Sequence, residues 1–251
     1  MKEYYITDDG IKLHIKLDMP SDYADGGKCP LAIVIHGLTG HMEEPHITGV
    51  ARTFNDIGIA TLRVEMYGHG NSEGKFEDHN LFKWLNNAMC VIRHARSLDF
   101  VTDMYICGHS QGGVTSLFLA GMYPDLFKAA ILLSPAYFIV KGATEGHMFH
   151  IDFDPCQIPE SVFVSDTEKV NGDYIRAAQL LDPDGAIERF KNPVLIVHGY
   201  EDEAIPVKYS VMLKDKYQNA RLVIINGDDH CYNYHLDQVL DAVTSFMKDI
   251  R

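Results

Sequence analysis

The sequence holds one serine in a turn suited to nucleophilic attack. Residues 108–112 read Gly-His-Ser-Gln-Gly and lie between an apolar run at 104–107 and an apolar segment of helical spacing at 111–122. A strand that turns sharply into a helix exposes the central hydroxyl, here that of Ser110, and leaves room only for glycine two residues to either side. The helix N-terminus also favours negative charge that develops there. The pattern predicts a nucleophile, the alternative being a glycine-rich turn with a capping serine.

A serine hydroxyl is a weak nucleophile and needs a base, for which the chain offers thirteen histidines. His230 follows the last apolar run, 222–225, in a loop expected at the carboxyl edge of the predicted sheet, where the sites of open α/β sheets collect. His36 and His109 precede the serine, and His198 ends a strand, where a structural role is more natural. His230 is therefore the predicted base, the alternative being an exposed loop histidine.

An acid must orient that imidazole and stabilise its cationic form. Asp202 lies just past the apolar run 194–197, again at the expected carboxyl edge, and it is the predicted acid. The alternatives are the other carboxylates near these two loops: Glu201, Glu203, Asp228 and Asp229.

Acyl transfer to a serine also needs two N–H groups that stabilise the oxyanion. We expect the first from the main-chain amide after the nucleophile, that of Gln111. The loop after the apolar run 31–35 reads His-Gly-Leu-Thr-Gly, and Leu38 within it is the predicted second donor. The alternative is that the glycines of this loop only turn the chain.

Apolar runs alternate with helical segments along the chain. The runs are 31–35, 60–64, 104–107, 130–133, 194–197 and 222–225, and the helical segments are 81–98, 111–122, 207–217 and 235–250. Continuous apolar runs suit strands buried on both faces, and the alternation predicts an α/β fold with a mostly parallel central sheet flanked by helices. At the start, 3–7 and 11–17 flank Asp-Asp-Gly, which predicts an N-terminal antiparallel hairpin at one edge of the sheet.

The composition fits one folded unit. The chain has 251 residues, of which 46% are hydrophobic and 23% charged, enough for one large core. We expect a single domain over residues 1–251. The stretch 136–180 lacks an obvious strand-helix unit and mixes aromatic with acidic residues, so we expect it to be a small inserted lid.

Charge and cysteine content bear on partners and location. Twenty-two Lys and Arg face 35 Asp and Glu, and the formal net charge of −13 repels nucleic acid and anionic membrane surfaces at long range. We therefore expect a neutral small-molecule substrate and neither nucleic acid nor membrane as partner. The five scattered cysteines and the lack of a leading apolar stretch predict reduced thiols and the cytoplasm. Whether the chain is a homodimer is left open.

The sequence predicts no cofactor and no metal. Residues 147–152, His-Met-Phe-His-Ile-Asp, could be written as a metal-ligand set, but their spacing is not an established one. The glycine-rich residues 67–72 lack the lysine of a phosphate-binding loop, and we interpret them as a structural loop.

Taken together, the chain resembles the bacterial cinnamoyl or feruloyl esterases of the α/β-hydrolase superfamily over nearly its whole length. The resemblance rests on the N-terminal hairpin and on residues 36–41, 66–72, 76–79, 108–113, 134–136, 197–199, 202 and 229–231. It implies a triad of Ser110, Asp202 and His230, with the amides of Leu38 and Gln111 as the oxyanion hole. The family often has Phe where this chain has Leu38, a change that a main-chain donor tolerates.

The resemblance also implies a substrate class. The lid would form an aromatic-acid pocket in which Tyr174 faces the substrate, and the reaction would be hydrolysis of hydroxycinnamic esters through an acyl-enzyme. The alternatives are a monoacylglycerol lipase or short-chain carboxylesterase, then a serine peptidase or thioesterase. Outside the enzymes, a binding protein with a dead hydrolase site is the alternative.

Overall fold

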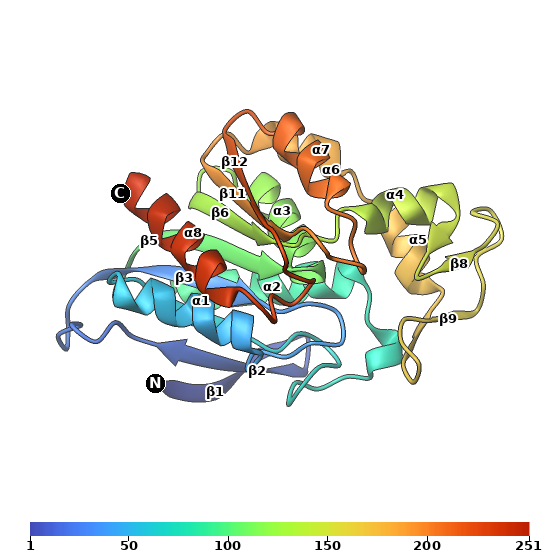
Figure 1. Ribbon diagram of the computed structural model, residues 1–251. Coiled ribbons are helices and arrows are strands. Elements are labelled where there is room, and N and C mark those ends of the chain that lie inside the picture. The colour runs from blue at the N-terminus through green and yellow to red at the C-terminus, as the bar shows by residue number, and fades with distance from the viewer. Residues whose placement is uncertain (251) are drawn as a thin grey trace.

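The computed structural model describes residues 1–250 and is built around one eight-stranded sheet (Figure 1). Its strands are β1 (Lys2–Asp8), β2 (Ile11–Asp18), β3 (Cys29–Ile35), β4 (Ala60–Val64), β5 (Val101–His109), β6 (Phe127–Leu133), β11 (Val194–Gly199) and β12 (Ala220–Ile225). They lie in the order β1-β2-β4-β3-β5-β6-β11-β12. The pairs β1–β2 and β2–β4 are antiparallel and the other neighbours are parallel. The predicted mostly parallel sheet with an N-terminal hairpin is confirmed.

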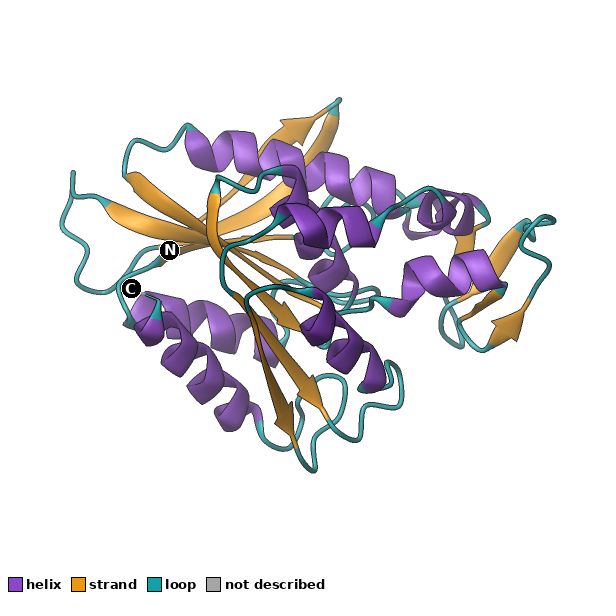
Figure 2. Ribbon diagram, turned by 90° about the horizontal axis from the view of Figure 1, so that it is seen from above, coloured by secondary structure: helices purple, strands orange, loops and turns teal. Residues whose placement is uncertain are grey.

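Helices cover both faces of this sheet (Figure 2). The larger ones are α1 (Pro45–Asp56), α2 (Leu81–Arg96), α3 (Gln111–Met122), α7 (Lys208–Lys216) and α8 (Leu236–Asp249). Two shorter elements are the helix α6 (Pro183–Arg189) and the 3₁₀ turn η1 (Phe76–Asp78). The strands send alternate side chains to opposite faces. One face packs on α1 and α8, and the other packs on α2, α3 and α6.

The helix α1 is the one large element that the sequence analysis did not predict. It begins with Pro45, which suits the first turn of a helix, and it buries Ile47, Val50 and Phe54 against the sheet. This spacing of three and four residues was the available signal.

Residues 136–180, here called the insert, lie beside the carboxyl edge of the sheet and add no strand to it (Figures 1 and 2). The insert contains the helices α4 (Phe138–Glu145) and α5 (Asp173–Gln179) and two small hairpins, β7 (His147–Met148) with β8 (Ile151–Asp152) and β9 (Ser161–Phe163) with β10 (Lys169–Asn171). Each element is too short to give a clear hydrophobic period, which is why the sequence showed none.

Within residues 1–250, no helix combines the length and the apolar character that crossing a membrane requires.

Seven histidines are buried within residues 1–250, and burial keeps five of them neutral. Burial lowers the pKa of His46 and His69 to about 4 and that of His79 to about 3, and it lowers the pKa of His36 and His109 well below the ordinary range. In the unfolded chain these side chains regain an ordinary pKa of about 6.5. Below that pH the unfolded state therefore binds more protons than the folded state.

We expect stability to fall steeply as the pH drops from about 6.5 toward 4, by about 1.4 kcal/mol per pH unit for each histidine that stays neutral in the fold. Melting temperatures followed by circular dichroism between pH 7.5 and 4.5 measure this slope. His79→Phe should flatten the slope by the share of one proton, because one buried neutral histidine is lost. An identical slope in His79→Phe and the wild type would contradict the account.

Candidate active site

Ser110 stands at a strained turn between β5 and α3. Its φ is 54° and its ψ is −116°, a conformation that a non-glycine residue rarely adopts. The flanking glycines are required, because a Cβ at Gly108 would lie 2.1 Å from the carbonyl oxygen of Gly112, and one at Gly112 would lie 2.3 Å from that of His36. The Ser110 N–H donates to the carbonyl oxygen of Leu133 at 2.9 Å, which fixes the turn to β6.

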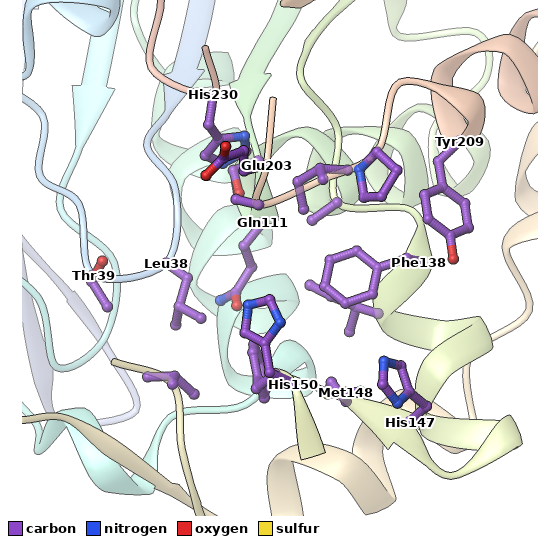
Figure 3. A pocket seen from close by; sticks show the side chains of 18 of the residues that line it. Leu38, Thr39, Gln111, Phe138, His147, Met148, His150, Glu203, Tyr209 and His230 are labelled. Atoms are coloured by element: carbon purple, nitrogen blue, oxygen red, sulfur yellow. The ribbon is translucent and has the colours of Figure 1, made fainter. Parts of the chain in front are cut away.

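Ser110 opens onto a cavity of about 450 Å³ between the sheet edge and the insert (Figure 3). Four parts of the chain line it: the loop after β3 with Leu38 and Thr39, the serine turn, the insert with Phe138 and residues 147–150, and the loops after β11 and β12 with residues 203–206 and His230. The cavity has the size of an ordinary small-molecule site.

Asp202 contacts the imidazole of His230, which lines the same cavity. The Nδ1 atom of His230 lies 2.6 Å from Oδ2 of Asp202, whose side chain is fully buried. Asp202 also accepts the Ile205 N–H at 2.7 Å and has Nε2 of His198 at 3.1 Å. Burial alone would raise the pKa of Asp202, but the hydrogen bonds from His198 and His230 and the adjacent imidazole charge lower it to about 2. The carboxylate is therefore ionised at neutral pH.

The other carboxylates considered from the sequence have different partners. Glu201 accepts the Gly227 N–H at 2.7 Å, and Glu203 is exposed on the cavity wall. Asp228 and Asp229 accept main-chain N–H groups of their own loop, those of residues 229, 231 and 233–235. Within residues 1–250, Asp202 is the only carboxylate in contact with the His230 imidazole.

Ser110 and His230 line the same cavity without a hydrogen bond between Oγ and Nε2 in the described residues. Free enzymes commonly keep this contact loose until substrate binds. The structure thus brings all three residues of the predicted triad to one place, with one of the two expected hydrogen bonds formed.

The two predicted oxyanion donors also lie on the cavity wall. Within residues 1–250, neither the Leu38 N–H nor the Gln111 N–H donates to a protein acceptor. Gly37 brings the first loop close to the nucleophile, since a Cβ there would lie 3.0 Å from Cβ of Ser110. Both amides are therefore free to bind an oxygen at the cavity wall.

The structure places Tyr174 away from the cavity wall. Its side chain is fully buried in α5 and does not line the cavity. Its hydroxyl donates to Oε1 of Gln111 at 2.5 Å instead. Burial raises the pKa of Tyr174 far above the ordinary range, so the hydroxyl keeps its proton as a donor. In this structure Tyr174 contacts the residue after the nucleophile and not the space for a substrate.

His109 precedes the serine in the sequence, and the structure places its ring against the main chain of His230. Its Nε2 atom lies 2.9 Å from the carbonyl oxygen of His230 and must carry the proton, because a carbonyl only accepts. Its ring also packs against that of His46, at 4.2 Å between centroids, and Nδ1 would lie 3.1 Å from a Cβ on Gly37. His109 thus contacts both the loop after β3, which contains Gly37 and Leu38, and the loop that contains His230. No local signal in the sequence shows a contact between residues 121 positions apart.

We expect His109→Leu to lower kcat about tenfold and to leave KM nearly unchanged, because the lost hydrogen bond frees the main chain of His230. His109→Gln can place an amide N–H where Nε2 stands and should recover most of the rate. Steady-state kinetics on a p-nitrophenyl ester, with melting curves to check folding, compare the two. Equal loss in both variants would mean that packing, and not the hydrogen bond, matters.

Comparisons with known proteins found a matching family model and similar solved structures. The family model described as serine aminopeptidase, S33, matches residues 28–151. Est1E from Butyrivibrio proteoclasticus with ferulic acid bound is 50% identical, covers 98% of each chain and superposes with a TM-score of 0.95. A second Est1E structure is 47% identical over 99% of this chain and 98% of that one, with a TM-score of 0.92.

Curated relatives are more distant. Human protein ABHD12B is 25% identical over 76% of this chain, and the chain spans about half of its length, 51%. The identity to Est1E over nearly the full length of both chains shows the family. This chain belongs to the α/β-hydrolase superfamily and, within it, to the bacterial cinnamoyl and feruloyl esterase family that its motifs resemble.

Proposed function

We propose that this protein is a serine carboxylesterase that hydrolyses esters of hydroxycinnamic acids. The observation that carries the proposal is the strained Ser110 turn on the same cavity as a His230 imidazole bonded to a buried, ionised Asp202. The acyl class is supported by the ferulic acid bound to Est1E, which is 50% identical to this chain.

In the proposed reaction, Oγ of Ser110 attacks the ester carbonyl carbon while Nε2 of His230 takes the hydroxyl proton. Nδ1–H of His230 donates to Asp202, whose negative charge stabilises the imidazolium. The tetrahedral oxyanion accepts the free N–H groups of Leu38 and Gln111. Collapse breaks the bond to the alcohol, which leaves with the proton from His230.

The acyl-enzyme is then hydrolysed by the same groups. Water attacks the acyl carbonyl carbon as His230 takes its proton, and the second tetrahedral oxyanion uses the same two amides. Collapse releases the carboxylic acid and returns the proton to Oγ of Ser110. The reaction consumes one ester and one water and needs no cofactor.

The insert supports the choice of an aromatic acyl group. It contributes Phe138, Met148 and Phe149 to the wall of the cavity that Ser110 and Gln111 also line. We propose that the insert acts as a lid that encloses the acyl part of the substrate, within a single domain. The apolar and aromatic side chains on this part of the wall suit a flat aromatic acid.

A small-molecule ester is the only partner that the proposed reaction requires. We also propose a cytoplasmic location, which is supported by the five cysteines, all present as free thiols.

Ser110→Ala should lower kcat by about 10⁴-fold or more, because no other group can form the acyl-enzyme. It should also abolish labelling by a fluorophosphonate probe, which the wild-type serine should bind covalently. Esterase activity and labelling of purified protein measure both effects. Wild-type esterase activity in the variant would refute the nucleophile, and an unlabelled wild type would indicate a dead site.

Among methyl ferulate, monooleoylglycerol and p-nitrophenyl octanoate, we expect methyl ferulate to have the highest kcat/KM, by about tenfold or more, because the insert provides aromatic walls. Initial rates for the purified wild type decide this. Preference for the long acyl chains would instead support a monoacylglycerol lipase or general carboxylesterase and would leave the serine mechanism intact.

A further inference from the structure

The peptide group between Gly37 and Leu38 contains one of the two N–H groups that the proposed reaction uses. Leu38 lies on the cavity wall (Figure 3), and within residues 1–250 its N–H has no protein acceptor. The N–H of a planar trans peptide points away from the carbonyl oxygen of the same peptide. Whatever fixes the Gly37 carbonyl therefore also fixes the direction of the Leu38 N–H.

Two donors contact this carbonyl. Nδ1 of the buried His36 lies 2.7 Å from the Gly37 carbonyl oxygen, and the Gly40 N–H donates to the same oxygen at 3.2 Å. The bond from Gly40 closes a turn over residues 37–40, in which Thr39 has a φ of 59°. A β-branched residue rarely adopts this left-handed conformation. The turn alone is therefore a weak support for the peptide, and the bond from His36 is the shorter of the two.

The surroundings of His36 determine which of its ring nitrogens carries the proton. The Met66 N–H, just after β4, donates to Nε2 of His36 at 3.1 Å, so Nε2 is an acceptor. Burial lowers the pKa of His36 well below its ordinary range, so the ring is neutral and its single proton is on Nδ1. Nδ1–H therefore donates to the Gly37 carbonyl. The loop that begins at Met66 thus acts on the Gly37–Leu38 peptide through this ring.

Aromatic packing keeps the His36 ring in place. The ring centroids of His69 and Trp84 lie 5.1 Å and 5.2 Å from that of His36, and the Trp84 ring stands edge-on at 79°. All three side chains are buried. His69 is fixed in turn, since its Nδ1 atom lies 2.9 Å from the carbonyl oxygen of Tyr67. A ring that is packed on two sides has little room to turn its N–H away from the Gly37 carbonyl.

We propose that His36 is a positioning residue for ester hydrolysis, because its Nδ1–H holds the Gly37 carbonyl so that the Leu38 N–H points at the oxyanion. The inference rests on the proposed function. The same bond polarises the shared peptide group, which makes the Leu38 N–H a stronger donor. Full negative charge forms on the substrate oxygen only as the tetrahedral intermediate is approached, so the effect belongs to kcat and not to substrate binding. His36 itself does not line the cavity.

Two variants separate the two hydrogen bonds of this ring. His36→Asn can place an amide N–H where Nδ1–H stands and keeps the bond to the Gly37 carbonyl. His36→Gln can place an amide oxygen where Nε2 stands and keeps only the bond from Met66. With p-nitrophenyl acetate, kcat should fall about thirtyfold in His36→Gln but only about threefold in His36→Asn, and KM should stay nearly unchanged in both. Melting temperatures should fall by similar amounts, since each variant loses one buried hydrogen bond.

A trifluoromethyl ketone tests the oxyanion directly. Oγ of Ser110 adds to its carbonyl carbon, the hydroxyl proton passes to His230, and the adduct keeps the negative oxygen next to the two amides. Its inhibition constant should rise in parallel with the loss of kcat, so it should rise more in His36→Gln than in His36→Asn. An inhibition constant that does not change in either variant would contradict the proposal.

His69→Gln is the matched control, because it removes an Nδ1 bond to a carbonyl in the same cluster, and Tyr67 does not line the cavity. It should lower the melting temperature and leave kcat within about twofold of the wild type. Equal losses of kcat in all three variants would overturn the inference, because packing of the cluster would then explain them, and the esterase function would stand.

A measurement on the wild type covers the case in which the His36 variants do not fold. Heteronuclear NMR of the histidine-labelled protein should show His36 as the neutral Nδ1–H tautomer, with a proton protected from exchange. An Nε2–H tautomer would overturn the inference. A folded wild type that does not hydrolyse p-nitrophenyl acetate would instead overturn the proposed function, and the inference with it.

Discussion

The site depends on compensation of one buried charge, the carboxylate of Asp202. Its side chain is fully buried, and three N–H groups surround it, from Ile205 in its own loop, His198 in β11 and His230 after β12. An uncompensated buried carboxylate would cost several kcal/mol, so these segments are stable only together. His198 is fixed in turn by Ser210 at 2.6 Å, which ties α7 to the same network. The orientation of the His230 imidazole is thus a consequence of how the fold satisfies this charge.

Main chains also approach one another closely at the sheet edge, and these contacts fix the loops around Ser110 and His230. A Cβ at Gly199 would lie 2.4 Å from the carbonyl oxygen of Asp229, so the loop that contains His230 packs directly on the end of β11. Tyr232 anchors the same loop by donating to the carbonyl oxygen of Val197 at 2.9 Å. In the same way, Gly37 allows the loop after β3 to approach Ser110 closely. His109 then connects the loops, since it contacts both Gly37 and the carbonyl of His230.

The parts that the sequence predicted are those with a period or a chain order. Strands such as β3 and β11 are continuous apolar runs because both faces are buried, and Ser110, Asp202 and His230 follow strands whose carboxyl ends meet at one edge. The contacts of His109 and Tyr174 could not be derived in this way. Each depends on a hydrogen bond to a residue distant in sequence, at 2.9 Å to His230 and at 2.5 Å to Gln111. Such contacts exist only once the fold has formed.

The insert resisted prediction for a different physical reason. Its strands have two or three residues each, fewer than any period needs, and its tightest turn contains neither the Asn nor the Gly that marks a type I′ hairpin. Phe149 and His150 occupy that turn against local preference while facing the cavity. The insert is therefore hard to predict because its short elements are fixed by contacts with the rest of the fold, such as those of the buried Met148 and Tyr174 with the core, and not by a local pattern.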